Sequence, residues 1–189
     1  MTAVVYDVVG LGNAIVDVIS AQDDAFLTKW GINKDAMNLI EEDRADALTE
    51  ASVNAVETSG GSGANTIAGV ASFGGKAAYI GKVADDRLGK VFKEDMEKGG
   101  VPFETTPLTD GPATARSIIF VTPDGKRSMN TFLGASVEFA PSDVDRNRQV
   151  QGNPVRRGLG QDEPLCLCRG SRQGHRREQD RQHSGGPPF

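Results

Sequence analysis

The stretch Gly60–Gly89 reads GGSGANTIAGVASFGGKAAYIGKVADDRLG, and the rest of the chain is organised around it. Its opening turn, Gly60-Gly61-Ser62-Gly63, is followed by small and apolar residues at helical spacing, which predicts a helix. Glycine has no Cβ, and the N–H groups at a helix start carry partial positive charge. The turn therefore predicts a binding site for oxygen-rich ligands, with the amide of Asn65 one helical turn away.

The remainder of the stretch predicts a strand and a second helix. Gly74 and Gly75 are expected to end the first helix, as C-terminal glycines do. Ala77–Val83 is predicted to be a buried strand, and the acids Asp85 and Asp86 are typical of a helix start. Taken alone, the pattern is also compatible with an ordinary helix–turn–strand unit that has a flexible glycine loop.

This stretch resembles the N-terminal signature of the ribokinase-like (PfkB) family of sugar and nucleoside kinases. The matching residues are Gly60, Gly61, Gly63, Asn65, Gly74 and the pattern Asp85-Asp86-x-x-Gly89. Two positions depart from the family pattern. Ile67 replaces a small residue but is common in the adenosine-kinase-like branch, and Ala84 replaces a glycine. The resemblance implies that Gly61, Ser62 and Asn65 bind substrate.

A second motif, GLGNAIVD, follows a predicted strand at Tyr6–Leu11. A dinucleotide fingerprint would need a third glycine at position 15, which is Ile15. The resemblance instead implies that Asn13 and Asp17 contact the sugar hydroxyls of the substrate. A carboxylate can accept two hydroxyl hydrogens at once, which suits a vicinal diol. The alternative is that Asp17 is a turn or cap residue.

The resemblance assigns the next region to a small β lid over the substrate. A helix is predicted at Ala25–Trp30, a short strand at Met37–Ile40 and an amphipathic helix at Glu41–Val56. Within the short strand, Met37 and Leu39 either face a base or sugar or serve only in packing.

A hairpin is predicted from two strands, Ala113–Val121 and Ser128–Leu133, joined by the turn residues Pro123-Asp124-Gly125. It resembles the adenosine-kinase-like branch in the run Thr122–Gly125, in Arg127 and in Leu133-Gly134-Ala135. Met129 and Thr131 alternate with Asn130 and Phe132 along the second strand. The resemblance implies that Met129 and Thr131 face the pocket, and it covers residues 5–145.

The charge distribution marks a boundary near residue 145. Residues 1–145 carry 8 Lys and 4 Arg against 22 acids, a net charge of −10. Residues 146–189 carry 9 Arg, no Lys and 4 acids, a net charge of +5. We therefore divide the chain into the N-terminal part of a kinase domain, 1–145, and an unstructured Arg-rich tail, 146–189.

Three interpretations of this tail remain open. It is a basic segment that binds nucleic acid, a zinc site, or the product of a shifted reading frame or truncation. The zinc candidates Cys166, Cys168, His175 and His183 do not have a standard ligand spacing. The shifted frame is favoured, because dropping one nucleotide from allowed codons for Gly174–Gly186 gives a sequence similar to the family.

The resemblance implies an α/β fold of the ribokinase type: a central, mostly parallel sheet, flanking helices and a small β lid, incomplete at the C-terminus. It also implies transfer of the γ-phosphoryl of ATP, with Mg²⁺, to a primary hydroxyl of a sugar or nucleoside, with adenosine favoured. The family's catalytic base lies in a Gly-Ala-Gly-Asp motif that is absent from these 189 residues. We therefore predict substrate-side residues without a catalytic base, an anion hole or an ATP site.

The alternative function is that of a non-catalytic ligand-binding or interaction protein with a basic tail. Composition is typical of a soluble globular protein, with 38% hydrophobic and 25% charged residues. No apolar run reaches the ~20 residues that span a bilayer. Neither a secretory signal nor a disulfide framework is visible, so a cytoplasmic location without membrane partners is predicted. A nucleic-acid partner is not favoured, and the oligomeric state is left open.

Overall fold

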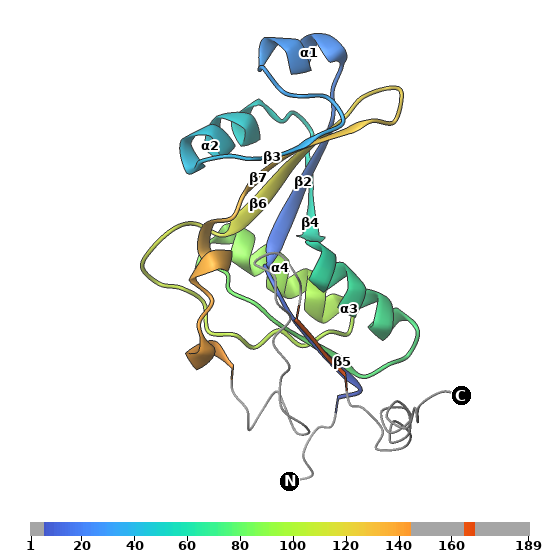
Figure 1. Ribbon diagram of the computed structural model, residues 1–189, viewed down its shortest axis with the longest axis vertical. Helices are drawn as coiled ribbons and strands as arrows, with labels where there is room; N and C mark the ends of the chain where they lie inside the picture. The colour runs from blue at the N-terminus through green and yellow to red at the C-terminus, as the bar shows by residue number, and fades with distance from the viewer. Residues whose placement is uncertain (1–5, 145–164, 169–189) are drawn as a thin grey trace, which may run out of the picture.

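The computed structural model describes residues 6–144 and 165–168, which form two sheets with helices packed against them (Figure 1). A five-stranded sheet has the order β3-β7-β6-β2-β4, and a three-stranded sheet has the order β5-β1-β8. The elements are β1 Val8–Leu11, β2 Ile15–Ala21, α1 Asp24–Lys29, β3 Met37–Leu39, α2 Glu42–Ala51, β4 Val56–Gly60, α3 Ser62–Ser72, β5 Ala77–Ile80, α4 Arg87–Lys98, β6 Ala115–Val121, β7 Arg127–Phe132, the 3₁₀ turns η1 Gly134–Glu138 and η2 Pro141–Asp143, and β8 Leu165–Cys168.

The Gly60–Gly89 stretch folds largely as its sequence predicts. Helix α3 begins directly after Gly61, which has a φ of +85° that favours glycine. The chain leaves this helix through Gly74, also at φ +85°, and enters the buried strand β5. Asp86 caps α4 by accepting a hydrogen bond from the Gly89 N–H at 2.7 Å. The strand is shorter than predicted, because it ends at Ile80 rather than at Val83.

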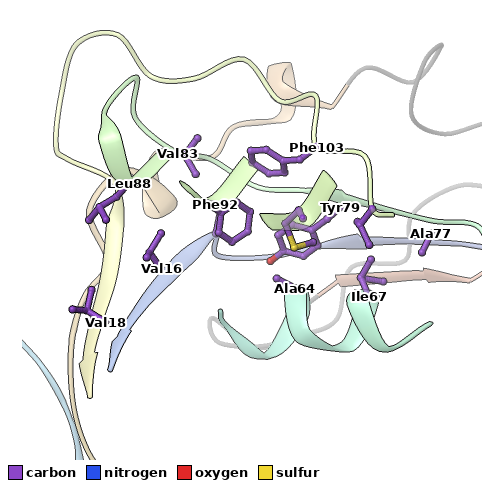
Figure 2. Close-up of a cluster of buried hydrophobic side chains, with 13 residues drawn as sticks. Val16, Val18, Ala64, Ile67, Ala77, Tyr79, Val83, Leu88, Phe92 and Phe103 are labelled. Atoms are coloured by element: carbon purple, nitrogen blue, oxygen red, sulfur yellow. The ribbon is translucent and has the colours of Figure 1, made fainter. Parts of the chain in front are cut away.

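The main core lies where α3 and α4 pack against the two sheets (Figure 2). Tyr79, Phe92 and Phe103 form its aromatic centre, with the Phe92 and Phe103 ring centroids 5.0 Å apart. Val16 and Val18 of β2 join this cluster from the five-stranded sheet. A second cluster packs α1 and α2 against Ile118, Phe120 and Phe132 of the hairpin. The two sheets are therefore each held by helices on one face.

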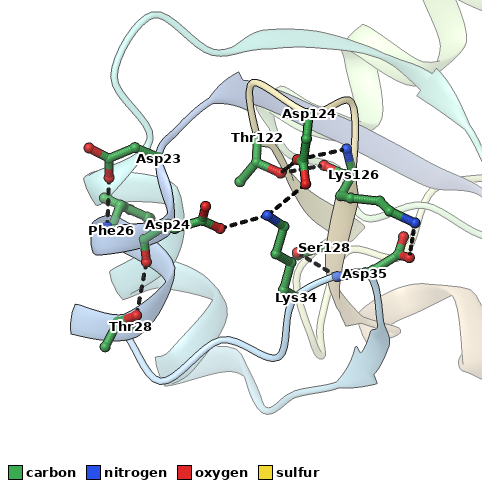
Figure 3. Close-up of polar contacts among 10 residues, drawn as sticks. All are labelled: Asp23, Asp24, Phe26, Thr28, Lys34, Asp35, Thr122, Asp124, Lys126 and Ser128. Carbon is green, nitrogen blue, oxygen red and sulfur yellow. Dashed lines mark hydrogen bonds and ion pairs between the residues drawn. The ribbon is translucent and has the colours of Figure 1, made fainter.

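Polar contacts tie the hairpin turn to the segment around α1 (Figure 3). Lys34 forms ion pairs with Asp24 of α1 at 2.7 Å and with Asp124 of the turn at 2.8 Å. Lys126 reaches Asp35 at 2.6 Å. The hydrogen bond from Lys34 lowers the pKa of Asp124. Because all of these side chains except Lys34 are more than half exposed, each pair adds little stability.

Helix α2 and the following strand differ from the sequence prediction. The predicted helix Glu41–Val56 ends at Ala51, because Asn54 takes a left-handed φ of +54° and turns the chain. Val56 then begins β4, a strand that the sequence did not indicate.

The α/β class and the flanking helices are confirmed, while the sheet is mixed rather than mostly parallel. In the five-stranded sheet β2 pairs in parallel with β6 and antiparallel with β4. In the smaller sheet the β1–β5 pair is parallel and the β1–β8 pair is antiparallel. β3, in the region that the resemblance assigns to the lid, belongs to the larger of the two sheets in the described part of the chain.

Within the tail, the structure describes Leu165–Cys168 as β8, paired with β1. This pairing differs from the expectation that residues 146–189 contain no strand. These four residues are an uninterrupted run of leucine and cysteine, and they pair with an edge of β1 that would otherwise leave its backbone groups open. Residues 145–164 and 169–189 lie outside the described part, and with them the candidate zinc residues His175 and His183. The described helices include none with the length and apolar character needed to cross a membrane.

Candidate functional site

Asp17 lies in the middle of β2, in a row of residues that crosses all five strands of the larger sheet. The register aligns it with Thr58 of β4 on one side and with Ser117 of β6 on the other. Ser117 is aligned with Thr131 of β7, which is aligned with Leu39 of β3. Directly opposed residues in neighbouring strands share a face, so this row is polar from Thr58 to Thr131 and ends at the apolar Leu39. Asp17 is therefore a strand residue, and the interpretation as a turn or cap residue is wrong.

This face of the sheet is turned away from the covering helices. Val16 and Val18, which alternate with Asp17 along β2, pack into the core with α4. Ile118 and Phe132 of the hairpin likewise pack against α1 and α2. Side chains alternate between the faces of a strand, so Asp17, Ser117 and Thr131 point the other way.

The glycine turn lies directly against this row. A Cβ atom at Gly60 would overlap the Asp17 carboxylate, so the carboxylate occupies the space above the glycine backbone. A Cβ at Gly61 would lie 3.0 Å from the Asn13 carbonyl oxygen. The hydroxyl of Tyr79 donates to that same carbonyl at 3.1 Å, which fixes the loop between β1 and β2. The backbone of Asn13 and the carboxylate of Asp17 therefore both lie against the glycine turn, and their contact with a substrate stays a prediction.

The Asp17 carboxyl is in an environment that disfavours its charge. Partial burial raises its pKa above the ordinary value of 3.8, and the positive charge of Arg127 opposes this shift more weakly. A partly desolvated carboxylate makes stronger hydrogen bonds than an exposed one. The position is suited to binding hydroxyl groups.

Ser117 belongs to the row although the sequence did not single it out. Its hydroxyl hydrogen-bonds that of Thr131 at 2.9 Å, and both residues are buried. A buried hydroxyl pair leaves unused hydrogen-bonding capacity, because each oxygen has two lone pairs and one proton. The alternation of β6 against β7 could have indicated Ser117 once the hairpin register was known.

The other predicted lid residues lie on the same face, one row further along. The register aligns Met37 of β3 with Met129 of β7, two residues from Leu39 and Thr131 respectively. Met37 and Leu39 are 58% and 63% exposed, which is unusual for apolar side chains on a sheet. These four residues and Asp17 therefore share one surface, and their contact with a substrate stays a prediction.

Ser62 and Asn65 lie in the first turn of α3, where both are exposed. The Asn65 N–H donates to the Gly61 carbonyl at 3.0 Å, so its backbone belongs to the helix start. Among the described residues, no hydrogen bond joins either side chain to the Asp17 row.

An open, mostly apolar groove lies elsewhere, at the end of β2 and β6 near Ala21, Phe26 and Pro123, and the Asp17 row does not line it. The described residues hold no group of three or more His, Cys, Asp or Glu arranged for a metal ion.

Replacing Gly60 with alanine is expected to push the Asp17 carboxylate out of the row. The added methyl group would overlap that carboxylate, which can move by rotating its side chain. If this face binds adenosine, as the resemblance implies, we expect that affinity to fall about tenfold, which corresponds to ~1.4 kcal/mol, while the fold persists. Isothermal titration measures this loss, and Ser59→Ala on the same strand is the control. Unchanged affinity in Gly60→Ala would contradict a substrate contact by Asp17.

The family model for "pfkB family carbohydrate kinase" matches residues 25–153, more than half of the chain. The chain therefore belongs to the PfkB family of carbohydrate kinases.

Solved structures and curated relatives agree with this assignment. A crystal structure of adenosine kinase from Sinorhizobium meliloti is 61% identical with a TM-score of 0.69 and matches 74% of this chain. A probable sugar kinase protein from Rhizobium etli CFN 42 is 54% identical with a TM-score of 0.69 and matches 75% of this chain. An ATP-dependent ribose-1-phosphate kinase of Halopiger xanaduensis is 31% identical over 110 residues, 56% of this chain. This chain spans 43% of the length of each of the two solved structures and 37% of the Halopiger protein.

Proposed function

We propose that this chain supplies the nucleoside-binding part of an ATP-dependent PfkB kinase, with adenosine as the favoured substrate. The observation that carries the proposal is the partly buried Asp17 carboxylate, which lies against Gly60 in a row with Ser117 and Thr131. The 61% identity to a protein named adenosine kinase supports the choice of adenosine over other nucleosides and sugars.

In this proposal, each group of residues on the Asp17 face of the five-stranded sheet contacts a different part of the nucleoside. The two Asp17 oxygens accept the hydrogens of the ribose 2′- and 3′-hydroxyls, and Asn13 and the Gly61 N–H contact the same sugar. The exposed side chains of Met37 and Leu39 and the half-buried side chain of Met129 cover the base, with the Thr131 hydroxyl beside them. Ser62 and Asn65, at the start of α3, would bound the sugar on the side of the glycine turn.

The cofactors implied by the family are ATP and Mg²⁺, which supply the phosphoryl group and stabilise its charge during transfer. Transfer depends almost entirely on positioning and on charge stabilisation. The residues described above bind and orient the acceptor nucleoside. The Gly-Ala-Gly-Asp motif that carries the base in the family does not occur among these 189 residues.

Binding of adenosine to the 189-residue chain tests the proposal directly. We expect adenosine to bind measurably and 2′,3′-dideoxyadenosine to bind about 10- to 100-fold more weakly, because it lacks the diol that Asp17 accepts. Isothermal titration of both ligands gives the ratio. Equal affinities would contradict recognition of the diol. Binding of neither ligand would favour the alternative of an interaction protein with a basic tail.

We expect the 189-residue chain to show no transfer of phosphate from ATP to adenosine in the presence of Mg²⁺. A coupled assay for ADP formation measures this, with a full-length adenosine kinase as the positive control. Turnover that copurifies with the chain and disappears in Asp17→Ala would show that the chain contains a base outside the family motif, and would overturn the expectation.

A further inference from the structure

The outer edge of β4 is held by side chains of helix α4. Among the described strands β4 pairs with β2 alone, so its other edge leaves backbone groups open. The Asp95 carboxylate accepts the Ser59 N–H of that edge at 2.9 Å. Two residues earlier, Glu57 accepts a two-pronged hydrogen bond from Arg87, with one of its N···O distances 2.7 Å. Helix α4 therefore contacts β4 at two points just before the glycine turn.

These contacts act on the face of the sheet opposite to Asp17. The register aligns Ser59 with Val16, and Val16 packs with Phe92 of α4 in the main core. Thr58, which lies between the two contacted residues, is aligned with Asp17 on the other face. Helix α4 thus contacts β4 on the face of the sheet that carries Val16, while the Asp17 row lies on the opposite face.

The strand leads directly into the turn that meets Asp17. Gly60 follows Ser59, and a Cβ there would overlap the Asp17 carboxylate; Gly61 comes next, and a Cβ there would lie 3.0 Å from the Asn13 carbonyl oxygen. Both glycines lack side chains that could anchor them, and Gly61 takes a left-handed φ of +85°. Their position therefore depends on how firmly the end of β4 is held.

We propose that Asp95 is a positioning residue for the candidate site, acting through the Ser59 N–H to hold Gly60 and Gly61 against Asp17 and Asn13. The proposal rests on the proposed function for its effect on adenosine but not for its effect on the backbone. Asp95 contributes more than Arg87, because the Arg87 side chain is 67% exposed and its ion pair is screened by water. A charged acceptor for a backbone N–H at a sheet edge is a stronger contact.

The test compares Asp95→Ala with Asp95→Asn in the full chain. Alanine removes the acceptor, whereas asparagine keeps one oxygen at the same place and is expected to restore most of the contact. Glu94→Ala is the matched control, since Glu94 is the exposed neighbour on the same helix and pairs only loosely with Lys98 at 3.6 Å. Amide hydrogen exchange at residues 59–61 and adenosine affinity are measured for all three variants.

We expect Asp95→Ala to speed exchange at residues 59–61 at least about tenfold, with exchange in α3 and β5 unchanged. Adenosine affinity should fall by a similar factor, and Asp95→Asn and Glu94→Ala should behave like the parent chain. Unchanged exchange at residues 59–61 in Asp95→Ala would overturn the proposal, as would equal losses in alanine and asparagine.

Two further results distinguish a failure of this proposal from a failure of the proposed function or of folding. If the parent chain does not bind adenosine, the proposed function fails, while the exchange data still decide the role of Asp95. If Asp95→Ala does not fold, the Ser59 N–H of the parent chain decides instead. Slow exchange there supports the contact, and exchange at the rate of an exposed amide overturns it.

Discussion

Replacing Asp17 with asparagine is expected to make the chain more stable and, at the same time, to remove most of the affinity for adenosine that we propose. The two effects have one cause, the partial burial of a carboxylate. Burial raises the pKa of Asp17 above 3.8. Between pH 3.8 and that raised pKa, the folded chain therefore keeps a proton that the unfolded chain has mostly released. At neutral pH the charged form therefore costs stability, and asparagine, which carries no charge, avoids that cost.

The difference in stability between the variant and the parent chain is expected to depend on pH. Well below pH 3.8 Asp17 is protonated in both the folded and the unfolded chain, so asparagine and aspartic acid should give similar stability. As the pH rises from 3.8 through the raised pKa of the folded state, the parent chain loses stability relative to the variant. Above that pKa the difference is complete and no longer changes.

The loss of affinity follows from the hydrogen bonds that asparagine cannot make. The carboxylate offers two acceptor oxygens to a diol, and the amide offers one acceptor and one donor group. Losing a hydrogen bond to a charged acceptor costs ~1.5–3 kcal/mol, or about 10- to 100-fold in affinity. Thermal unfolding at pH 7 and near pH 3, with isothermal titration of adenosine at pH 7, measures both effects. Asp110→Asn, at an exposed loop position, is the control. A variant that is less stable at pH 7, or that binds adenosine normally, would contradict this account.

The elements predicted correctly are those whose signals are local. Gly61 and Gly74 bound α3 because their positive φ angles favour glycine, and Asp86 caps α4 through a contact three residues away. The hairpin also depends on a local turn, in which the Gly125 N–H donates to the Thr122 carbonyl at 2.8 Å. Such signals are present in a single stretch of sequence and need no partner from elsewhere.

The elements missed are those that depend on distant partners. β4 has the polar sequence VETSG, which is held as a strand by pairing with β2 and by the contact from Asp95. Nothing within the strand indicates either partner, and Val56 was assigned to a helix for that reason. The role of Asp17 as a central strand residue was missed because its two neighbours, Thr58 and Ser117, lie some 40 and 100 residues away.

The candidate site combines residues indicated by local motifs with residues whose position depends on distant strand partners. Motifs indicated Asn13, Asp17 and Gly61 through a family resemblance, and in the structure the glycine turn lies against the Asp17 carboxylate and the Asn13 carbonyl. Ser117 carries no motif, and only the register of β6 between β2 and β7 places it beside Asp17 and Thr131. A residue of this kind can be found from the sequence only when the strand pairing is already known.

Replacing Gly89 with alanine should be strongly destabilising, although alanine is the better helix former. Gly89 lies in the first turn of α4, where a Cβ would overlap the Ala84 carbonyl oxygen and lie 3.1 Å from the Thr114 hydroxyl oxygen. These groups cannot move aside freely. The Asp86 carboxylate accepts from the Gly89 N–H at 2.7 Å and the Thr114 N–H at 2.8 Å, and the Ala84 N–H donates to the Thr114 hydroxyl at 2.9 Å.

The expected loss is ~2–3 kcal/mol, the upper part of the range for forcing extra volume into a packed region. Gly69→Ala is the matched control, because Gly69 lies within α3 and a Cβ there meets no atom within 4 Å. That substitution should stabilise the chain by ~0.5–1 kcal/mol through helix propensity alone. Chemical denaturation of the two variants measures the difference, which isolates the overlap at Gly89 from the shared gain in propensity. If both substitutions stabilise the chain, then the Asp86–Thr114 network can shift, and it does not fix the start of α4.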